Sequence, residues 1–332
     1  MVYIYKKTIG TKTYYYLRAS EVKGNKIIVK DVAYLGSSIE EVKNSINNLP
    51  KYKEKIKKAY KKIHNVIESN YYLKKVEDLK LKKDDFLEDN LNEIEACKIH
   101  FNAIFEKQDN LTKNEILKNF IVEFAFNTTS IEGNTIKLEE ARSLLEEGFT
   151  PKNKTLREIY DLQNTEKVFF DLLNKKEDLT HDFIINVHEN LLKNIDPRIS
   201  YRTSDVRVKL ANFKATPFPY VKTDMDLLLK FYEQNKNKLH PFVLASIFHH
   251  KFEKIHPFMD GNGRTGRMLL NYILIRNNYP PLIISKKKRD LYLDALKEAD
   301  KSELLEASKE KYRRLLVFNA NEMSKNYWNI FL

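Results

Sequence analysis

The chain contains a single cysteine, Cys97, so no internal disulfide can form. Glycine and proline are also scarce, at 8 and 9 of 332 residues, which excludes collagen-like, linker-rich and strand-dense architectures. No apolar run reaches the roughly 18 to 20 residues that span a bilayer, and the N-terminal segment MVYIYKKTIG lacks the continuous apolar core of a secretory signal. These absences predict a cytoplasmic protein.

The residues that are present indicate a folded, basic protein. Hydrophobic residues make up 42% and aromatic residues 12% of the chain, which excludes intrinsic disorder, and 332 residues are enough for two or three folded units. Lysine and arginine number 58 against 46 acidic residues, a formal net charge of +12. This charge favours partners that carry phosphate, and by itself it leaves nucleotides, nucleic acids and membrane surfaces open.

Residues 1–49 are predicted to form a small β-rich N-terminal module. Three stretches rich in β-branched and aromatic residues, separated by glycines, are typical of an antiparallel meander: Tyr3–Lys7, Thr13–Arg18 and Ile27–Tyr34. From Ser38 the sequence SIEEVKNSINNL has a helix N-cap and acidic residues in the first turn, so a helix should follow the strands.

Residues 50–109 are predicted to be a basic helical connector that begins at Pro50. Apolar side chains recur every three or four residues, as on one face of an amphipathic helix, at Tyr52, Ile56, Tyr60, Ile63 and Ile67. Residues 51–85 contain twelve lysines and only six acidic residues. A solvated outer helix face explains this charge, and a nucleic-acid surface is the alternative.

Residues 110–332 are predicted to be mainly α-helical. Periodicity and cap residues place one helix at about 88–107, within the connector, and further helices at about 113–130, 137–147, 155–174, 181–193, 223–236, 241–254, 263–277 and 288–317. Segment 206–221 is the exception, because VRVKL alternates strictly and a second short extended piece follows, ending in TPFPYV. We therefore expect a β-hairpin within an otherwise helical domain.

Three of the eight glycines, Gly261, Gly263 and Gly266, lie close together in HPFMDGNGRTGR, the segment from His256 to Arg267. Without Cβ atoms, consecutive backbone NH groups can form an anion-binding nest, particularly where a helix N-terminus follows. The apolar segment MLLNYILI after Arg267 supplies that helix. The spacing therefore predicts a phosphate-binding turn.

The sequence context excludes other motifs with similar spacing. GNGRTG matches G-x-G-x-x-G and its outer glycines match a Walker A loop, but both motifs follow a β-strand, whereas PFVLASIFHHKFEKI before this turn is helical. Walker A also requires Lys and Ser or Thr, where this chain has Arg267 and Met268. Zinc is disfavoured because His249, His250 and His256 lack the H-E-x-x-H arrangement, and we assign the first two to the core or to the support of the site.

The residues around the turn are suited to chemistry on a nucleotide. His256 can act as a base near neutral pH, Asp260 offers a hard oxygen ligand for Mg²⁺, and Arg264 and Arg267 share one helix face. Each alone has an ordinary explanation, as a packed histidine, a turn-forming aspartate or solvated arginines. Their joint occurrence within twelve residues favours a functional site.

This segment resembles the signature of the Fic family of nucleotide transferases, H-P-F-x-[DE]-G-N-G-R-x-x-R, at all nine specified positions. The segments YRTSDVRV and NNYPPLII are similar to the family as well, and the resemblance covers roughly residues 110–315. It implies a mainly α fold, with a helical Fic core and a β-hairpin flap. In this chain the small N-terminal antiparallel β module and the helical connector precede that core.

The resemblance implies a protein adenylyltransferase that moves AMP from ATP to a Tyr, Thr or Ser hydroxyl of a target protein and releases pyrophosphate. It assigns His256 as the catalytic base and Asp260 as the Mg²⁺ ligand. It assigns phosphate binding to Gly261, Asn262, Gly263, Arg264 and Arg267. These roles agree with phosphoryl-type transfer, which depends mainly on in-line positioning and charge neutralisation.

A second segment, TTSIEGN from Thr128 to Asn134, resembles the inhibitory motif of the family, [ST]-x-x-x-E-[GN]. The resemblance implies an inhibitory helix near residues 113–133, in which Glu132 followed by Gly133 pairs with Arg267 and neutralises the arginine that should receive the γ-phosphate. Alone, the short motif would favour an ordinary helix that ends at a glycine C-cap, and it is the intact Fic signature beside it that favours the inhibitory role.

The expected flap departs from the usual pattern of the family, because Ala211-Asn212 and Pro217-Phe218-Pro219 replace a glycine turn and a Pro-Pro pair. Its alternating residues would leave a free strand edge that binds an extended target loop by strand addition: Val206, Arg207, Val208, Lys209 and Leu210.

The expected partners are ATP and a protein with an exposed hydroxyl, which includes the chain itself, and no membrane. A homodimer stays open. Two alternative functions remain at this point: removal of AMP from a modified protein by the same site, and nucleic-acid binding by the basic 51–85 region with a vestigial Fic core.

Overall fold

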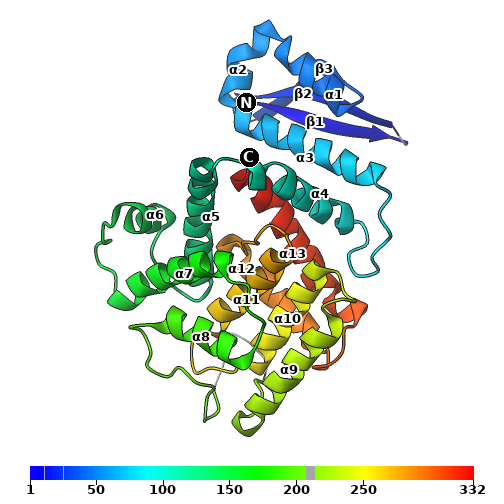
Figure 1. Cartoon of the computed structure of the whole chain (residues 1–332). Coiled ribbons are helices and arrows are strands. Elements are labelled where there is room, and N and C mark those ends of the chain that lie inside the picture. The colour runs from blue at the N-terminus through cyan, green and yellow to red at the C-terminus, as the bar shows by residue number, and fades with distance from the viewer. Residues whose placement is uncertain (11, 25, 207–213) are drawn as a thin grey trace.

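The computed structural model describes residues 1–332 except residues 11, 25 and 207–213. A small β-sheet lies at one end of the molecule and a larger helical body at the other, with helices α3 (Tyr60–Asp78) and α4 (Asn90–Ala103) between them (Figure 1). The last helix, α13 (Lys309–Ile330), packs on α3 and α4 and brings the C-terminus close to the sheet.

The sheet has three antiparallel strands in the order β1 (Val2–Ile9), β2 (Lys12–Lys23) and β3 (Lys26–Gly36), as the sequence predicts. Alternate residues of β2 point to one face, where Leu17 is fully buried. This face packs against α1 (Ile39–Asn47), whose N-cap Ser38 accepts a hydrogen bond of 3.2 Å from the NH of Glu41. The small core of the module is completed by residues of α3, including Ile63 and Ile67.

The connector is less regular than its apolar spacing suggests. A short 3-10 turn, η1 (Pro50–Tyr52), leads into α2 (Lys53–Lys58), and α3 begins only after Ala59. Tyr60 is 61% exposed, so the expectation that it shares the buried face is wrong. The reason is the break at Ala59, which shifts the helical phase between α2 and α3.

The helical body is built around α10 (Pro241–Ile255) and α11 (Asn262–Arg276), which pack on each other and are almost entirely buried. The remaining helices surround this pair: α5 (Asn110–Ile131), α6 (Leu138–Glu147), α7 (Leu156–Asn174), α8 (His181–Leu192), α9 (Val221–Asn235) and α12 (Arg289–Ala299), with 3-10 turns η2 (Phe105–Lys107), η3 (Phe218–Tyr220) and η4 (Lys286–Lys288). A mainly α fold is therefore confirmed, and no described helix is long and apolar enough to cross a membrane.

Two sequence-based expectations about elements need correction. The predicted helix at 288–317 is two helices, α12 and α13, because the ammonium groups of Lys251 and Lys254 bind four backbone carbonyls between residues 300 and 306, at 2.6–2.7 Å. The prediction that the second extended piece continues to the end of TPFPYV is also wrong, because residues 218–220 form η3 and α9 begins at Val221. Pro219 fits the first turn of η3 because its ring fixes a helical φ.

Candidate active site

The site lies in the turn between α10 and α11, at the centre of the helical body. The turn reverses the chain through two residues with positive φ, His256 at 55° and Gly261 at 75°. The side chain of Asn262 closes it, because its Oδ1 accepts from the NH of Phe258 and its Nδ2 donates to the carbonyl of Phe258, both at 2.9 Å. Asn262, expected to bind phosphate, therefore uses its amide to hold the turn in shape.

His256 occupies the C-cap of α10. Its Nδ1 lies 3.3 Å from the carbonyl oxygen of Glu253, and burial lowers the pKa of the imidazole below the ordinary 6.5. Its own backbone carbonyl accepts a 2.8 Å hydrogen bond from Nε of Arg202, which also donates its backbone NH to the carbonyl of Pro257 at 2.9 Å. Arg202, in the YRTSDVRV segment, was not predicted as a site residue, although it fixes the backbone on both sides of the His–Pro bond.

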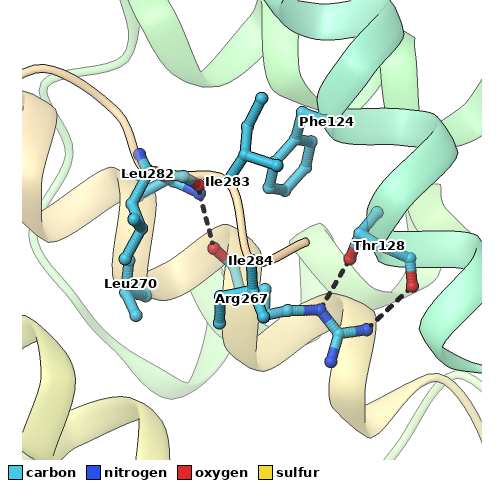
Figure 2. Close-up of a pocket in the computed structure, with 8 residues that line it drawn as sticks. Phe124, Thr128, Arg267, Leu270, Leu282, Ile283 and Ile284 are labelled. Atoms are coloured by element: carbon cyan, nitrogen blue, oxygen red, sulfur yellow. Dashed lines mark hydrogen bonds between the residues drawn. The ribbon is translucent and has the colours of Figure 1, made fainter. Parts of the chain in front are cut away.

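The first turn of α11 faces the C-terminal end of α5. Arg267 donates Nε to Thr128 Oγ1 at 2.7 Å and Nη2 to the carbonyl of Thr128 at 3.0 Å (Figure 2). The same Nη2 donates to Oε1 of Glu132 at 2.7 Å. Burial by itself lowers the pKa of Arg267, but the charge of Glu132 raises it, with a net rise. The structure thus brings Glu132 and Arg267 together as the resemblance implies, and it adds Thr128 as a second partner of the arginine.

The carboxylate of Glu132 also lies over the backbone of Gly263. A Cβ at position 263 would stand 2.0 Å from Glu132 Oε1 and 3.0 Å from Nη1 of Arg267. Only glycine leaves room for a carboxylate at this helix N-terminus, where backbone NH groups attract anions. Glu132 therefore occupies the position that the sequence analysis assigns to a phosphate group.

Apolar side chains surround the aliphatic part of the Arg267 side chain. Figure 2 shows Phe124 of α5, Leu270 of α11 and the segment from Leu282 to Ile284 around the base of the arginine. Asn271 holds this segment in place, because its Nδ2 donates to the carbonyl of Leu282 and its Oδ1 accepts from the NH of Leu282. The guanidinium extends from this apolar support toward Thr128 and Glu132.

Arg264 points to a different partner from that of Arg267. Its side chain is 3% exposed and forms an ion pair with Asp161 of α7, while its Nη2 lies 3.6 Å from Oδ1 of Asp260. Burial raises the pKa of Asp161, and the neighbouring guanidinium opposes that rise. Asp161 was not predicted, because it lies about a hundred residues before the turn and carries no local motif.

Asp260 is the only carboxylate that the turn itself offers, and its Oδ1 accepts a 2.6 Å hydrogen bond from the NH of Gly261. Within residues 1–206 and 214–332, apart from 11 and 25, no group of three His, Cys, Asp or Glu side chains could hold a metal ion. Mg²⁺ often binds through one or two carboxylates together with substrate phosphates. The donor set fits an ion of that kind and not one held by the protein alone.

A buried layer below the turn contains Glu253, His249 and Tyr292, none of which was predicted as a catalytic residue. His249 Nε2 lies 2.6 Å from the hydroxyl of Tyr292, and burial raises the pKa of Glu253 to about 8. A Cβ at Gly266 would stand 2.6 Å from Glu253 Oε1 and 2.8 Å from His249 Nδ1. The third glycine thus allows α11 to approach this layer. His249 and His250 are both buried, at 0% and 1% exposure.

The expected flap is only partly described. Val206 lies outside any strand, and four of the residues expected in the flap lie outside the described residues: Arg207, Val208, Lys209 and Leu210. The two ends of the segment are close together, because the NH of Phe218 donates to Oδ1 of Asp205 at 2.9 Å.

Comparison with known proteins agrees with this geometry. Residues 178–274 match the model of the Fic/DOC family. The protein adenylyltransferase Fic of Aedes aegypti is 32% identical over 206 residues, which cover 59% of this chain and 40% of that protein. The protein adenylyltransferase fic-1 of Caenorhabditis elegans is 32% identical over 187 residues, or 54% of this chain and 37% of that protein. The chain thus spans about two fifths of the length of these relatives.

Solved structures agree on the fold. A Fic family protein from Desulfovibrio desulfuricans superimposes with a TM-score of 0.59 at 26% identity and covers 74% of this chain and 75% of its own. A Fic domain containing signalling protein from Bacteroides thetaiotaomicron has a TM-score of 0.64 at 22% identity and covers 71% of this chain and 95% of its own. Residues 178–274 are thus similar to the Fic/DOC family, and the expected Fic fold is confirmed.

Proposed function

We propose that the chain is a protein adenylyltransferase, which transfers AMP from ATP to a Tyr, Thr or Ser hydroxyl of a target protein. The observation that carries the proposal is the turn from His256 to Arg267, where a base, a carboxylate, a glycine nest and two fixed arginines meet. The adenylyltransferase names of the relatives support it, although the chain spans only 40% of the first and 37% of the second.

The proton acceptor is Nε2 of His256. Its Nδ1 faces the carbonyl of Glu253, an acceptor only, so the bond between them requires the proton on Nδ1 and makes Nε2 the ring nitrogen that accepts a proton. The lowered pKa keeps this imidazole neutral at pH 7. As the hydroxyl oxygen bonds to the α-phosphorus, its proton passes to Nε2 and pyrophosphate leaves with the electrons of the broken P–O bond.

The first turn of α11 binds the negative charge of the phosphates. Arg264 and Arg267 are held by buried contacts before any nucleotide binds, so they require little reorganisation as charge develops. We assign the backbone NH groups of Gly261 and Gly263 to the same phosphates, and Asn262 maintains the turn that carries them. Asp260 would hold Mg²⁺, which would neutralise phosphate charge.

Glu132 inhibits nucleotide binding in the conformation that the structure describes. Its carboxylate binds Arg267 and covers Gly263, so the nucleotide phosphates must displace it before they bind there. Thr128 holds Arg267 from the other side through two hydrogen bonds, and the arginine therefore stays in place when Glu132 leaves.

The test uses the Glu132→Gly variant with ATP labelled at either the α- or the γ-phosphate. Label from the α-position and none from the γ-position should appear on protein hydroxyls, either of the chain itself or of proteins in a lysate. Transfer of the γ-label would indicate a kinase, and no transfer from either position would contradict the proposal. Release of AMP from a labelled target by wild type, lost in Glu132→Gly, would favour the reverse activity.

We propose nucleic-acid binding by the connector as a second candidate function. All seven lysines of residues 51–62 are exposed, and among the described residues only Lys55 of these forms an ion pair, with Glu21 at 3.4 Å. A groove of about 550 Å³ is lined by four of them, Lys55, Lys58, Lys61 and Lys62. Binding to duplex DNA or RNA should then fall steeply with salt, and equal binding by a triple glutamine variant of the last three lysines would rule it out. Nucleic-acid binding without any nucleotide affinity would favour a vestigial Fic core.

A further inference from the structure

The Asp260 carboxylate has three donors around it, and they differ in how firmly they are held. The NH of Gly261 is part of the turn, and Arg264 is buried against Asp161. The third donor is Arg157 of α7, whose Nη2 binds Oδ2 of Asp260 and whose side chain is 54% exposed. Of these three contacts among the described residues, that of Arg157 is the one that solvent reaches and that can be exchanged for another cation.

The position of Arg157 in its helix makes this contact unusual. It is the second residue of α7, where the unpaired NH groups of the helix start carry partial positive charge. A cation is disfavoured at that position unless an anion lies near it. Asp260, which lies in the turn before α11, supplies that anion.

The start of α7 is also bonded to the inhibitory segment. Glu158 accepts hydrogen bonds from the NH and the hydroxyl of Thr135, at 3.0 and 2.6 Å, and its carbonyl accepts from Nδ2 of Asn134 at 2.9 Å. Lys154 donates to the carbonyl of Thr135 at 2.9 Å. Glu132 and Arg157 are therefore carried by one hydrogen-bonded unit, which runs from the end of α5 to the start of α7.

We propose that Arg157 is a second inhibitory contact, acting on the metal ligand as Glu132 acts on the phosphate ligand. Arg157 holds the Asp260 carboxylate while Glu132 holds Arg267, so one structural unit neutralises both an anion and a cation of the site. This inference rests on the proposed function, because it takes Asp260 as the ligand of a divalent cation. Metal binding at Asp260 then requires that Arg157 leave.

The test measures Mn²⁺ affinity by electron paramagnetic resonance on the full chain with saturating α,β-methylene-ATP, which cannot release AMP. Arg157→Gln should tighten Mn²⁺ binding about threefold to tenfold. The expected gain is smaller than for a fully buried ion pair because the Arg157 side chain is half exposed. Arg313→Gln is the matched control, since Arg313 is 66% exposed and pairs with Glu88 instead. Its Mn²⁺ affinity should remain within about twofold of wild type.

Two outcomes would overturn the inference. Unchanged Mn²⁺ affinity in Arg157→Gln would mean that the arginine does not compete with the metal. Weaker binding of the nucleotide analogue by Arg157→Gln in the absence of metal would indicate that Arg157 binds phosphate. Asp260→Asn separates this failure from failure of the proposed function, because loss of Mn²⁺ binding in Asp260→Asn supports the metal site whatever Arg157 does. If Asp260→Asn binds Mn²⁺ as tightly as wild type, both the metal site at Asp260 and the inhibitory role of Arg157 are contradicted.

Discussion

Replacing Glu132 by glutamine should strengthen nucleotide binding, because it removes a negative charge from the place where phosphates bind while it preserves the shape of the side chain. Arg267 keeps two hydrogen bonds to Thr128 in this variant and so remains at the site. The gain in affinity therefore reports the contact that a nucleotide must break, between Arg267 Nη2 and Glu132 Oε1 at 2.7 Å.

The size of the gain follows from the burial of the two partners. A charged hydrogen bond contributes about 1.5–3 kcal/mol when buried, whereas an exposed ion pair contributes about 0.2–1 kcal/mol. The side chain of Arg267 is 3% exposed and that of Glu132 is 42% exposed, which places this pair between the two cases. A value of about 1–1.4 kcal/mol corresponds to an affinity increase of about five- to tenfold.

Isothermal titration calorimetry with the magnesium complex of α,β-methylene-ATP measures this difference directly. Glu139→Gln is the matched control, since Glu139 is an exposed glutamate at the start of α6, and its affinity should stay within about twofold of wild type. Equal affinities of wild type and Glu132→Gln would refute the assignment of Glu132 as a competitor of phosphate.

Three further outcomes are expected. Asp161→Asn should lower the free energy of unfolding by about 3 kcal/mol, measured by denaturant titration, because it leaves the buried Arg264 charge without its partner; an unchanged midpoint would contradict this. Gly263→Ala should displace Glu132, whose oxygen lies 2.0 Å from the new methyl group, yet keep labelling low even combined with Glu132→Gly, because the methyl fills the phosphate position; high labelling by the double variant would exclude that position. The labelling rate should fall toward acid pH with a midpoint below pH 6.5, because burial lowers the pKa of His256 below 6.5 and the base is lost on protonation; a midpoint above pH 6.5 would argue against His256 as the base.

The turn could be predicted from sequence because its signals are local. A chain with 8 glycines has three of them between positions 261 and 266, and the charged residues that use the turn lie within the same twelve residues. The pairing of Glu132 with Arg267 came from the resemblance of TTSIEGN to an inhibitory motif. The turn thus needed local signals only, whereas the pairing joins residues 135 apart and depended on that resemblance.

The residues that position the site could not be predicted in the same way. Asp161 and Arg157 lie on the start of α7, 103 residues before their partners Arg264 and Asp260, and only the packing of α7 on α11 brings them together. The break between α12 and α13 has the same origin, because buried lysines of another helix bind the carbonyls at the break. Periodicity reports which residues are apolar and carries no information on such partners.

The most direct test of the account compares the transfer of α-labelled AMP by wild type, Glu132→Gly and the double variant Glu132→Gly/His256→Ala. Because the site is complete but occupied by Glu132, we expect weak labelling by wild type, strong labelling by Glu132→Gly and none by the double variant. Equal labelling by wild type and Glu132→Gly would contradict self-inhibition. Undiminished labelling by the double variant would contradict the assignment of this turn as the active site.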